Sequence, residues 1–316
     1  MNISKYFPAL CLLLCACGGK PAGDRPQAIR IGYIGGHSQA AIIQQLGWFE
    51  EEFGRDSIRV TLQRFDYGPP EIEAFLAGDL DFGTVGDQPA IVGWAKGVDI
   101  KAIGSISGGY RLFGLVAGDA SGIRSTKDLK GKKVAVAAGT SYQHLLYLYL
   151  QEAGLEKADI QAVNLKFSES VTALASGDVD AAVLGEPFLS LVENRQLGKV
   201  VAFSDGLKYA VVPIVAAGDF LEKYPAIALR LLKLYDRANR WGLANRDSAI
   251  AIYRRDVPFL PHEVVEALYD KNPANIALND TMIHALRDTY GFLVQEGIVP
   301  GDRDISGFYD DGFGVR

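Results

Sequence analysis

Past residue 17 the sequence contains no cysteine. Cys11, Cys15 and Cys17 all lie in the N-terminal leader, so the rest of the chain offers no thiol for a disulfide, a nucleophile or a zinc site. The histidines show no paired metal-ligand spacing; they are His37, His144, His262 and His284. We therefore expect no metal and no cofactor, and a fold that its hydrophobic core alone stabilises.

Long apolar runs and an excess of basic residues are also missing. The apolar run of the leader, from Phe7 to Leu14, is too short to span a bilayer. The formal net charge is −6, from 32 Lys and Arg against 38 Asp and Glu, and an acidic chain argues against nucleic acid as a partner. With no low-complexity tract after the first thirty residues, disorder is not expected there.

The leader itself, MNISKYFPALCLLLCACGGK, indicates export. Residues 1–16 are predicted to be a signal peptide, and Leu14-Cys15-Ala16-Cys17 resembles the lipobox of bacterial lipoproteins, which implies a lipid on Cys17. Plain cleavage without lipid is the alternative. Residues 17–28 then form a tether of linker composition, and the expected location is the periplasm or the outer cell surface, anchored to the membrane by lipid.

One motif occurs twice, as GDLDFGTVGDQP at residues 78–89 and as GDVDAAVLGEPF at residues 177–188. Two further pairs repeat in the same order and register: IGYIGGHSQ with VAVAAGTSY, and IRVTLQRF (58–65) with IQAVNLKF (160–167). Each copy reads as strand, glycine-Ser loop, helix, strand, loop, helix, strand and Gly-acid loop. The repeat predicts two related α/β lobes, although all α/β units share part of this order.

A chain of 316 residues is long enough for two such lobes, each with its own core. We predict an α/β fold of two Rossmann-like lobes joined by two crossovers, with a ligand cleft between them. Residues 29–118 and 210–316 are assigned to lobe 1, and residues 119–209 to lobe 2. After Phe220 the pattern is amphipathic and helical, and these helices are expected to cover lobe 1. Asn279 or Asp280 is expected to cap the last of them.

Five segments, in this order, resemble the substrate-binding proteins of aliphatic sulfonate, taurine and nitrate ABC importers. They are GYIGGHS, FDYGPPEIEAFLAGDLDFGTVGDQP, DLKGKKVAVAAGTSYQHLL, LASGDVDAAVLGEPF and LVQEGIVPGDRDISGFYDDGF. The resemblance implies a type II periplasmic-binding-protein fold, capture of a small-molecule solute between hinged lobes, and delivery to a membrane permease. The aliphatic-sulfonate branch is the nearest, and nitrate or a pyrimidine thiamine precursor is the alternative ligand. We expect a monomer.

The two glycine-Ser loops are the candidate anion sites. Each opens a helix after a strand, where free backbone N–H groups and the helix dipole favour an anion. Their candidate residues are Gly36, His37, Ser38, Thr140 and Ser141. Simple capping of the two helices is the alternative role.

Two acids, Asp87 and Glu186, end the repeated motifs. They are expected either to grip an ammonium group of a zwitterion or to shape their own loops. Tyr67, Gln88, Tyr110 and Tyr142 lie in or beside the same loops. They are expected to cover the apolar part of a ligand and to add a hydrogen bond, while Phe188 is expected to pack between the lobes.

An enzyme on the same fold is the competing function. The acid pair could belong to a glycosidase, but two acids in turns are common. Ser38 or Ser141 with a histidine lacks the third, orienting member of a catalytic triad. We therefore expect binding without catalysis.

Overall fold

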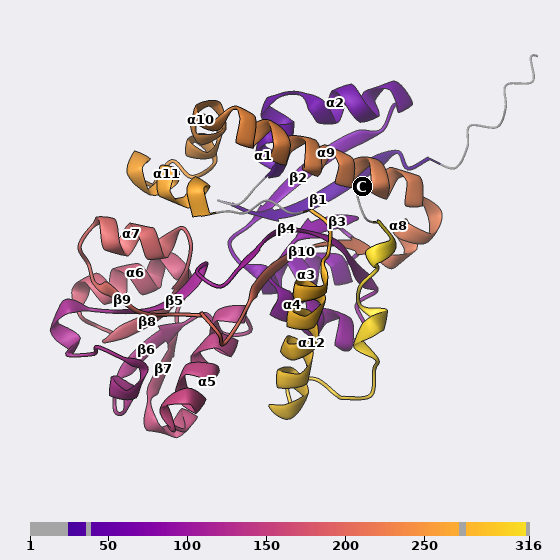
Figure 1. The fold of residues 1–316 in the computed structure, drawn as a ribbon. Coiled ribbons are helices and arrows are strands. Elements are labelled where there is room, and N and C mark those ends of the chain that lie inside the picture. The colour runs from indigo at the N-terminus through magenta and orange to yellow at the C-terminus, as the bar shows by residue number, and fades with distance from the viewer. Residues whose placement is uncertain (1–24, 36–38, 272–275, 314–316) are drawn as a thin grey trace, which may run out of the picture.

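The computed structural model describes residues 25–35, 39–271 and 276–313. The chain folds into two lobes, each built on a five-stranded sheet with helices packed on it (Figure 1). Several predicted features lie outside the described residues: the leader, Cys17, most of the tether, and Gly36, His37 and Ser38. In the described ranges, no helix is long and apolar enough to cross a membrane.

The first sheet has the strand order β2, β1, β3, β10, β4. The strands are β1 (Ala28–Ile34), β2 (Arg59–Phe65), β3 (Phe82–Thr84), β4 (Ile100–Gly109) and β10 (Ala210–Ala217). β1 runs parallel to β2 and β3, whereas β10 runs antiparallel to β3 and β4. The strand β10 therefore returns the chain from lobe 2 into the middle of this sheet.

The second sheet has the order β7, β6, β8, β5, β9. Its strands are β5 (Phe113–Ala117), β6 (Lys133–Val136), β7 (Gln161–Asn164), β8 (Ala181–Gly185) and β9 (Lys199–Phe203). β6 is parallel to β7 and β8, and β5 is antiparallel to β8 and β9. Order and directions repeat those of the first sheet, so the predicted pair of related α/β lobes is confirmed.

The strand β5 corrects the predicted lobe boundary. A boundary at residue 118 assigns β5 to lobe 1, but β5 pairs with β8 and β9 of lobe 2. It takes the same place in the second sheet that β10 takes in the first, so each lobe receives one strand across a crossover. An apolar strand beside a crossover carries no local signal for which sheet it joins, since pairing is decided by tertiary packing.

The first glycine of the repeated motif ends a helix in both copies. Gly78 follows α3 (Gly68–Leu76) and Gly177 follows α6 (Phe167–Ser176). Their φ angles are +75° and +78°, in the left-handed region that glycine adopts without a steric penalty. The first glycine of each copy of the motif therefore has a structural role, which is to end the preceding helix.

The second acid of the motif connects the strand that follows it to the neighbouring strand. Asp81 accepts a hydrogen bond of 2.7 Å from the backbone N–H of Arg30, in β1. In the second lobe Asp180 accepts one of 2.8 Å from the backbone N–H of Lys133, in β6. Each acid thus ties the strand it precedes to its parallel neighbour, which is a structural reason for an aspartate in both copies.

The helices of the two lobes surround the sheets. Before the C-terminal tail they are α1 (Gln39–Gln45), α2 (Trp48–Phe53), α3, α4 (Asp87–Ala95), α5 (Ser141–Ala153), α6 and α7 (Phe188–Asn194). The tail adds α8 (Gly218–Lys223), α9 (Pro225–Ala244), α10 (Arg246–Asp256), α11 (His262–Lys271) and α12 (Asp280–Gln295). As predicted, Asn279 caps α12, because its side chain accepts a hydrogen bond of 2.9 Å from Met282 N.

Most of the tail covers lobe 1, as expected: α9 packs on α1, and α12 packs on α4. α11 packs against α10 and also against α7 of lobe 2 (Figure 1). The tail is therefore also a contact between the lobes.

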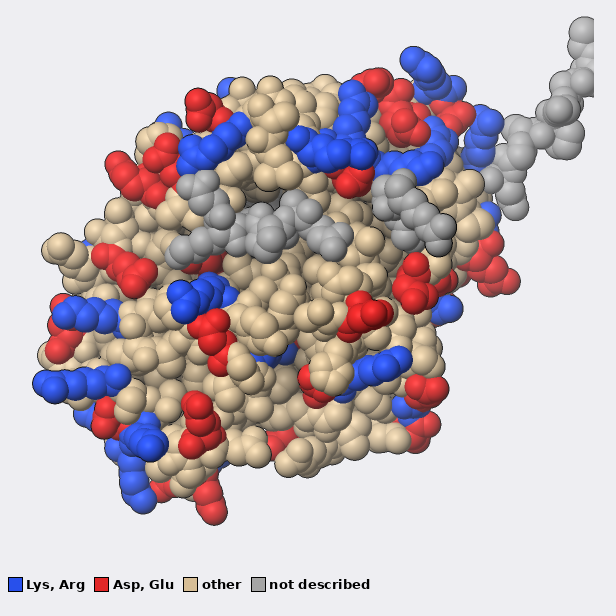
Figure 2. Space-filling model, in the orientation of Figure 1, with Lys and Arg blue, Asp and Glu red and all other residues tan. Residues whose placement is uncertain are grey.

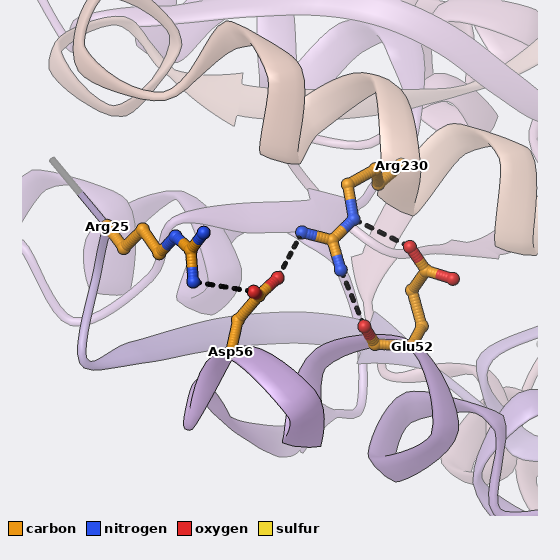
Figure 3. Close-up of polar contacts among 4 residues, drawn as sticks. All are labelled: Arg25, Glu52, Asp56 and Arg230. Atoms are coloured by element: carbon orange, nitrogen blue, oxygen red, sulfur yellow. Dashed lines mark hydrogen bonds and ion pairs between the residues drawn. The ribbon is translucent and has the colours of Figure 1, made fainter. Parts of the chain in front are cut away.

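Arg230 connects α9, the longest helix of the tail, to α2 of lobe 1 (Figure 3). Its guanidinium donates to Glu52 Oε1 and Asp56 Oδ2, each at 2.6 Å, and lies 4.9 Å from the centre of the Phe53 ring. Arg25 donates to the other oxygen of Asp56 at 2.6 Å. The hydrogen bond from Arg230 is the main cause that lowers the pKa of Asp56. These contacts hold α9 against α2 and the short turn that follows it.

Glu71, on α3, is a fully buried carboxyl group beneath the first sheet. Neither of its oxygens has a hydrogen-bond partner among the described residues. Burial raises its pKa well above the usual range, and the nearby backbone amide of Thr84 opposes this only in part. The Oε1 atom would lie 2.8 Å from a Cβ at Gly32, so the strand approaches the carboxyl group only because glycine stands there.

Replacing Glu71 by glutamine is expected to change how stability depends on pH. The folded state holds the Glu71 proton, while the unfolded chain loses it near pH 4.3, so this residue costs more stability as pH rises above about 4.3. Relative to wild type, the free energy of unfolding of Glu71→Gln should rise steadily between pH 4 and pH 8. Urea titrations at several pH values measure it, with the exposed Glu73→Gln as control. Parallel pH profiles for Glu71→Gln and wild type would contradict the expectation.

Candidate binding cavity between the lobes

A cavity lies between the two lobes, with about 690 Å³ of empty space including its mouth. Strand ends and loops of both sheets line it, and the lining is mainly apolar. Five of the predicted site residues contribute: Tyr67, Thr140, Ser141, Tyr142 and Glu186. The structure therefore brings residues from both copies of the repeat to one enclosed place, as ligand sites in open α/β sheets require.

The N-terminus of α5 forms the polar end of this cavity. Thr140 occupies the N-cap position, but its Oγ1 atom donates to the carbonyl oxygen of Ala137 at 2.6 Å and makes no cap hydrogen bond. The backbone N–H groups of Ser141 and Tyr142 have no hydrogen-bond partner among the described residues. Because α5 is thirteen residues long, its dipole adds a partial positive charge at these groups. Free N–H groups and the dipole together suit an anion.

Ser107 adds a hydroxyl group to the cavity that was not among the predicted site residues. It lies in β4, is fully buried, and lines the cavity. Its Oγ atom has no hydrogen-bond partner among the described residues. A buried polar atom without a partner is costly, so such a group is a natural donor for a bound molecule. Serine in a strand of small residues gives no sequence signal for this role.

Asp87 is held by a cation of the protein itself. Its Oδ2 atom lies 2.6 Å from the Lys208 Nζ atom and accepts a hydrogen bond of 2.8 Å from Thr289 Oγ1, while Ser141 donates to Oδ1. All four side chains are buried. Burial alone would raise the pKa of Asp87, but the Lys208 charge and these hydrogen bonds outweigh it and lower the pKa. The ammonium group that Asp87 holds in this structure is that of Lys208.

This cluster joins the lobes, since Asp87 and Thr289 belong to lobe 1, Ser141 to lobe 2, and Lys208 to the second crossover. Lys208 also donates to Thr289 Oγ1 at 2.9 Å. Lys208 and Thr289 could not be predicted as partners of Asp87, because they lie 121 and 202 residues from it and no local pattern connects them.

Glu186 bonds to its own helix. Its side chain accepts hydrogen bonds from the backbone N–H and the hydroxyl of Ser190, at 3.2 and 2.9 Å, in the first turn of α7. This is the loop-shaping arrangement that was one of the two predicted roles, although Glu186 also lines the cavity.

Aromatic rings form one wall of the cavity. The Tyr142 ring lies 4.6 Å from that of Phe113 and 4.8 Å from that of Phe167, measured between ring centres. Burial, then the nearby charges of Glu186 and Asp87, raise the pKa of Tyr142, so its hydroxyl stays protonated at neutral pH. Tyr67, at the start of α3, lines the cavity from lobe 1.

Three predicted residues lie outside the lining: Asp87, described above, and Gln88 and Tyr110. Gln88 is buried in α4, where its backbone N–H donates to Asp87 Oδ1 at 2.9 Å. Tyr110, in the first crossover, is 41% exposed and packs edge-on against Tyr209 with 5.1 Å between ring centres.

His144 lies farther along α5, in the contact between the lobes. Its ring stacks on Phe292 with 3.7 Å between ring centres. Burial, then the charge of Lys208, lower its pKa to about 2, so this histidine is neutral at physiological pH. It packs as an aromatic ring rather than as a charged group.

Basic and acidic side chains are interspersed over the face of the molecule drawn in Figure 2. Among the described residues on this face there is no broad basic surface of the kind that binds nucleic acid.

The paired sheets, the two crossovers and the enclosed cavity define a two-lobed protein with the periplasmic-binding-protein fold. The crystal structure of the periplasmic aliphatic sulphonate-binding protein of Escherichia coli superposes with a TM-score of 0.81 at 26% identity, covering 90% of this chain and 97% of that one.

A sequence model of the NMT1-like family matches residues 22–253, and the chain belongs to this family. A Bacillus subtilis (strain 168) protein named for the binding of aliphatic sulfonates is 34% identical over 310 residues, covering 96% of this chain and 93% of the relative. The taurine-binding periplasmic protein of E. coli (strain K12) is 26% identical over 289 residues, covering 86% of this chain and 88% of that protein.

Proposed function

We propose that the protein binds a small organic sulfonate, such as an alkanesulfonate or taurine, between its lobes and delivers it to the permease of an ABC importer. The observation that carries the proposal is the uncapped N-terminus of α5 at the polar end of an otherwise apolar cavity. The names of the relatives in B. subtilis and E. coli support the same ligand class.

The donors of the cavity suit a sulfonate in particular. Among its described lining residues none is a lysine or an arginine, so the head group would be held by neutral N–H and O–H groups. A sulfonate keeps its charge at any physiological pH and offers three acceptor oxygens. Neutral donors, preorganised at a helix N-terminus, can bind such an anion without a counter-charge. The apolar walls would then cover its carbon chain.

A ligand screen by isothermal titration calorimetry tests the proposal. Propanesulfonate or taurine should bind more tightly than nitrate, sulfate or a pyrimidine thiamine precursor. If only nitrate or only the pyrimidine binds, the sulfonate proposal is wrong and the corresponding alternative replaces it.

The Ser107→Ala variant tests the head-group site directly. It should weaken sulfonate binding by a few-fold to tenfold, because one neutral hydrogen bond contributes about 1 kcal/mol. Ser176→Ala, at an exposed position at the end of α6, is the matched control and should leave the affinity unchanged. Equal affinities for both variants and wild type would remove Ser107 from the site.

We further propose that the protein acts as a monomeric lipoprotein without catalytic activity. Cys17 would carry the lipid, residues 17–28 would be the tether, and closure about the two crossovers would enclose the ligand. Labelling of cells with a radioactive fatty acid tests the anchor: wild type should be labelled and Cys17→Ala should not. Labelling of both proteins would show that the lipid is attached to another residue.

A further inference from the structure

A second chamber adjoins the binding cavity at the boundary of the lobes. It shares Ile34, Tyr142, Phe167 and Glu186 with the cavity and contains about 960 Å³ of empty space including its opening. Phe188 of α7 and Phe259, in the loop after α10, stack across it with 6.2 Å between ring centres. A ligand whose head group lies at α5 would extend its other end into this chamber.

Two basic side chains line the chamber, and they occupy equivalent positions of the internal repeat. Arg64 is the seventh residue of IRVTLQRF, in β2 of lobe 1. Lys166 is the seventh residue of IQAVNLKF, two residues after the end of β7 of lobe 2. Both line the same chamber, one from each lobe. The binding cavity itself has no Lys or Arg in its described lining, so the two spaces differ in charge as well as in position.

Both cations are exposed side chains without an ion-pair partner in the described part of the chain. Among the described residues, no carboxylate lies within 4.0 Å of the Arg64 guanidinium or of the Lys166 ammonium group. Arg30 and Arg230, by contrast, are each paired with aspartate at 2.6 Å. The Arg64 guanidinium lies directly over Gly35, where a Cβ would come 2.5 Å from its Nη2 atom. Any side chain at position 35 would displace Arg64 from its place at the chamber.

Two acids also line the chamber. Glu186 accepts its hydrogen bonds from Ser190, at the N-terminus of α7, where the helix dipole compensates its charge. Asp66 is exposed, and its counterpart in the second copy of the repeat is the neutral Ser168. The feature common to both copies of the repeat is therefore the pair of cations, whereas Asp66 is an acid in one copy only.

On the basis of the proposed function, we infer that Arg64 and Lys166 bind a second acidic group, so that the preferred ligand is a sulfonate with a distal carboxylate or sulfonate on a short apolar spacer. Guanidinium and ammonium groups without partners bind carboxylate and sulfonate oxygens through charge-assisted hydrogen bonds. Contributions from both lobes would also favour the closed form when such a ligand is present.

Calorimetric titration with matched probes tests this inference. The probes are propanesulfonate, 3-sulfopropanoate, 4-sulfobutanoate and taurine. At least one sulfocarboxylate should bind about tenfold or more tightly than propanesulfonate. Arg64→Gln and Lys166→Gln should each weaken sulfocarboxylate binding by up to about fivefold, as expected for an exposed ion pair, and should leave propanesulfonate binding unchanged. Asp66→Asn should have the opposite effect on the sulfocarboxylate, and Arg59→Gln, on the same strand as Arg64, should have none.

The outcomes separate this inference from the function on which it rests. Equal affinity for propanesulfonate and both sulfocarboxylates, with no selective effect of Arg64→Gln, would overturn the inference and leave sulfonate binding intact. Taurine as the tightest probe would also overturn it, and would assign Asp66 or Glu186 to the ammonium group. No binding of any sulfonate would refute the proposed function itself.

Discussion

Replacing Lys208 by methionine is expected to lower the free energy of unfolding by about 3–5 kcal/mol at neutral pH, the usual cost of leaving one partner of a buried ion pair uncompensated. Asp87 would keep its burial but lose the only cation that the described structure places within 4.0 Å of it. Urea denaturation of the purified variant measures the effect. Because Lys208 lies in the crossover, the loss should also loosen the contact between the lobes.

The difference in stability between Lys208→Met and wild type should depend on pH. In wild type the lowered pKa of Asp87 means that its ion pair is kept above about pH 4 and is lost only as pH falls below that. In Lys208→Met the unpaired, buried carboxyl should instead have a raised pKa, so the stability gap to wild type should shrink as pH falls from 7 towards 4.

Two variants control for other causes. Adding Asp87→Asn to Lys208→Met should restore much of the lost stability, since no charge then remains buried. Lys223→Met removes an exposed pair with Asp219 and should change stability by less than about 1 kcal/mol. If Lys208→Met and Lys223→Met had equally small effects on the free energy of unfolding, the buried Asp87–Lys208 pair would not contribute to stability as expected.

Replacing Val212 by phenylalanine is expected to weaken ligand binding by about tenfold to a hundredfold. Val212 is half-buried in β10 and lines the cavity between the lobes. A larger ring there occupies ligand space, and overpacking of this kind costs about 1–3 kcal/mol. Isothermal titration calorimetry with propanesulfonate measures it.

The matched control is Val60→Phe, the same substitution at a half-buried position of the edge strand β2. Its binding affinity should equal that of wild type, and thermal unfolding of both variants should confirm that each is folded. Unchanged affinity for Val212→Phe would place the ligand elsewhere than in this cavity.

Local features of the sequence were sufficient to predict the repeated architecture. The left-handed glycines Gly78 and Gly177 and the cap Asn279 act through hydrogen bonds and dihedral angles within a few residues of themselves. Such features leave a pattern that can be read directly. The helix N-terminus at Ser141 was also predictable, because a strand followed by a glycine-Thr-Ser turn and an amphipathic run indicates one.

Other parts of the site could not be predicted, and β5 and Asp87 show why. The apolar residues of β5 suit either sheet, so only the packing of the lobes decides that it joins the second. For Asp87 the sequence left two roles open, an ammonium clamp or a loop-builder. The structure shows a third arrangement, because it brings Lys208 and Thr289 to this carboxylate from distant parts of the chain.

The sequence by itself therefore determined the number of lobes and the order of their elements, because these depend on periodicity, turn residues and an internal repeat. The family was indicated by the resemblance of five sequence segments to known binding proteins. Only the tertiary structure decided which side chains meet in the cavity, which acid is already neutralised, and that Arg64 and Lys166 line one chamber. The physical reason is that a pairing between distant residues depends on how two sheets dock across the crossovers, and that geometry leaves no trace in the sequence around either partner.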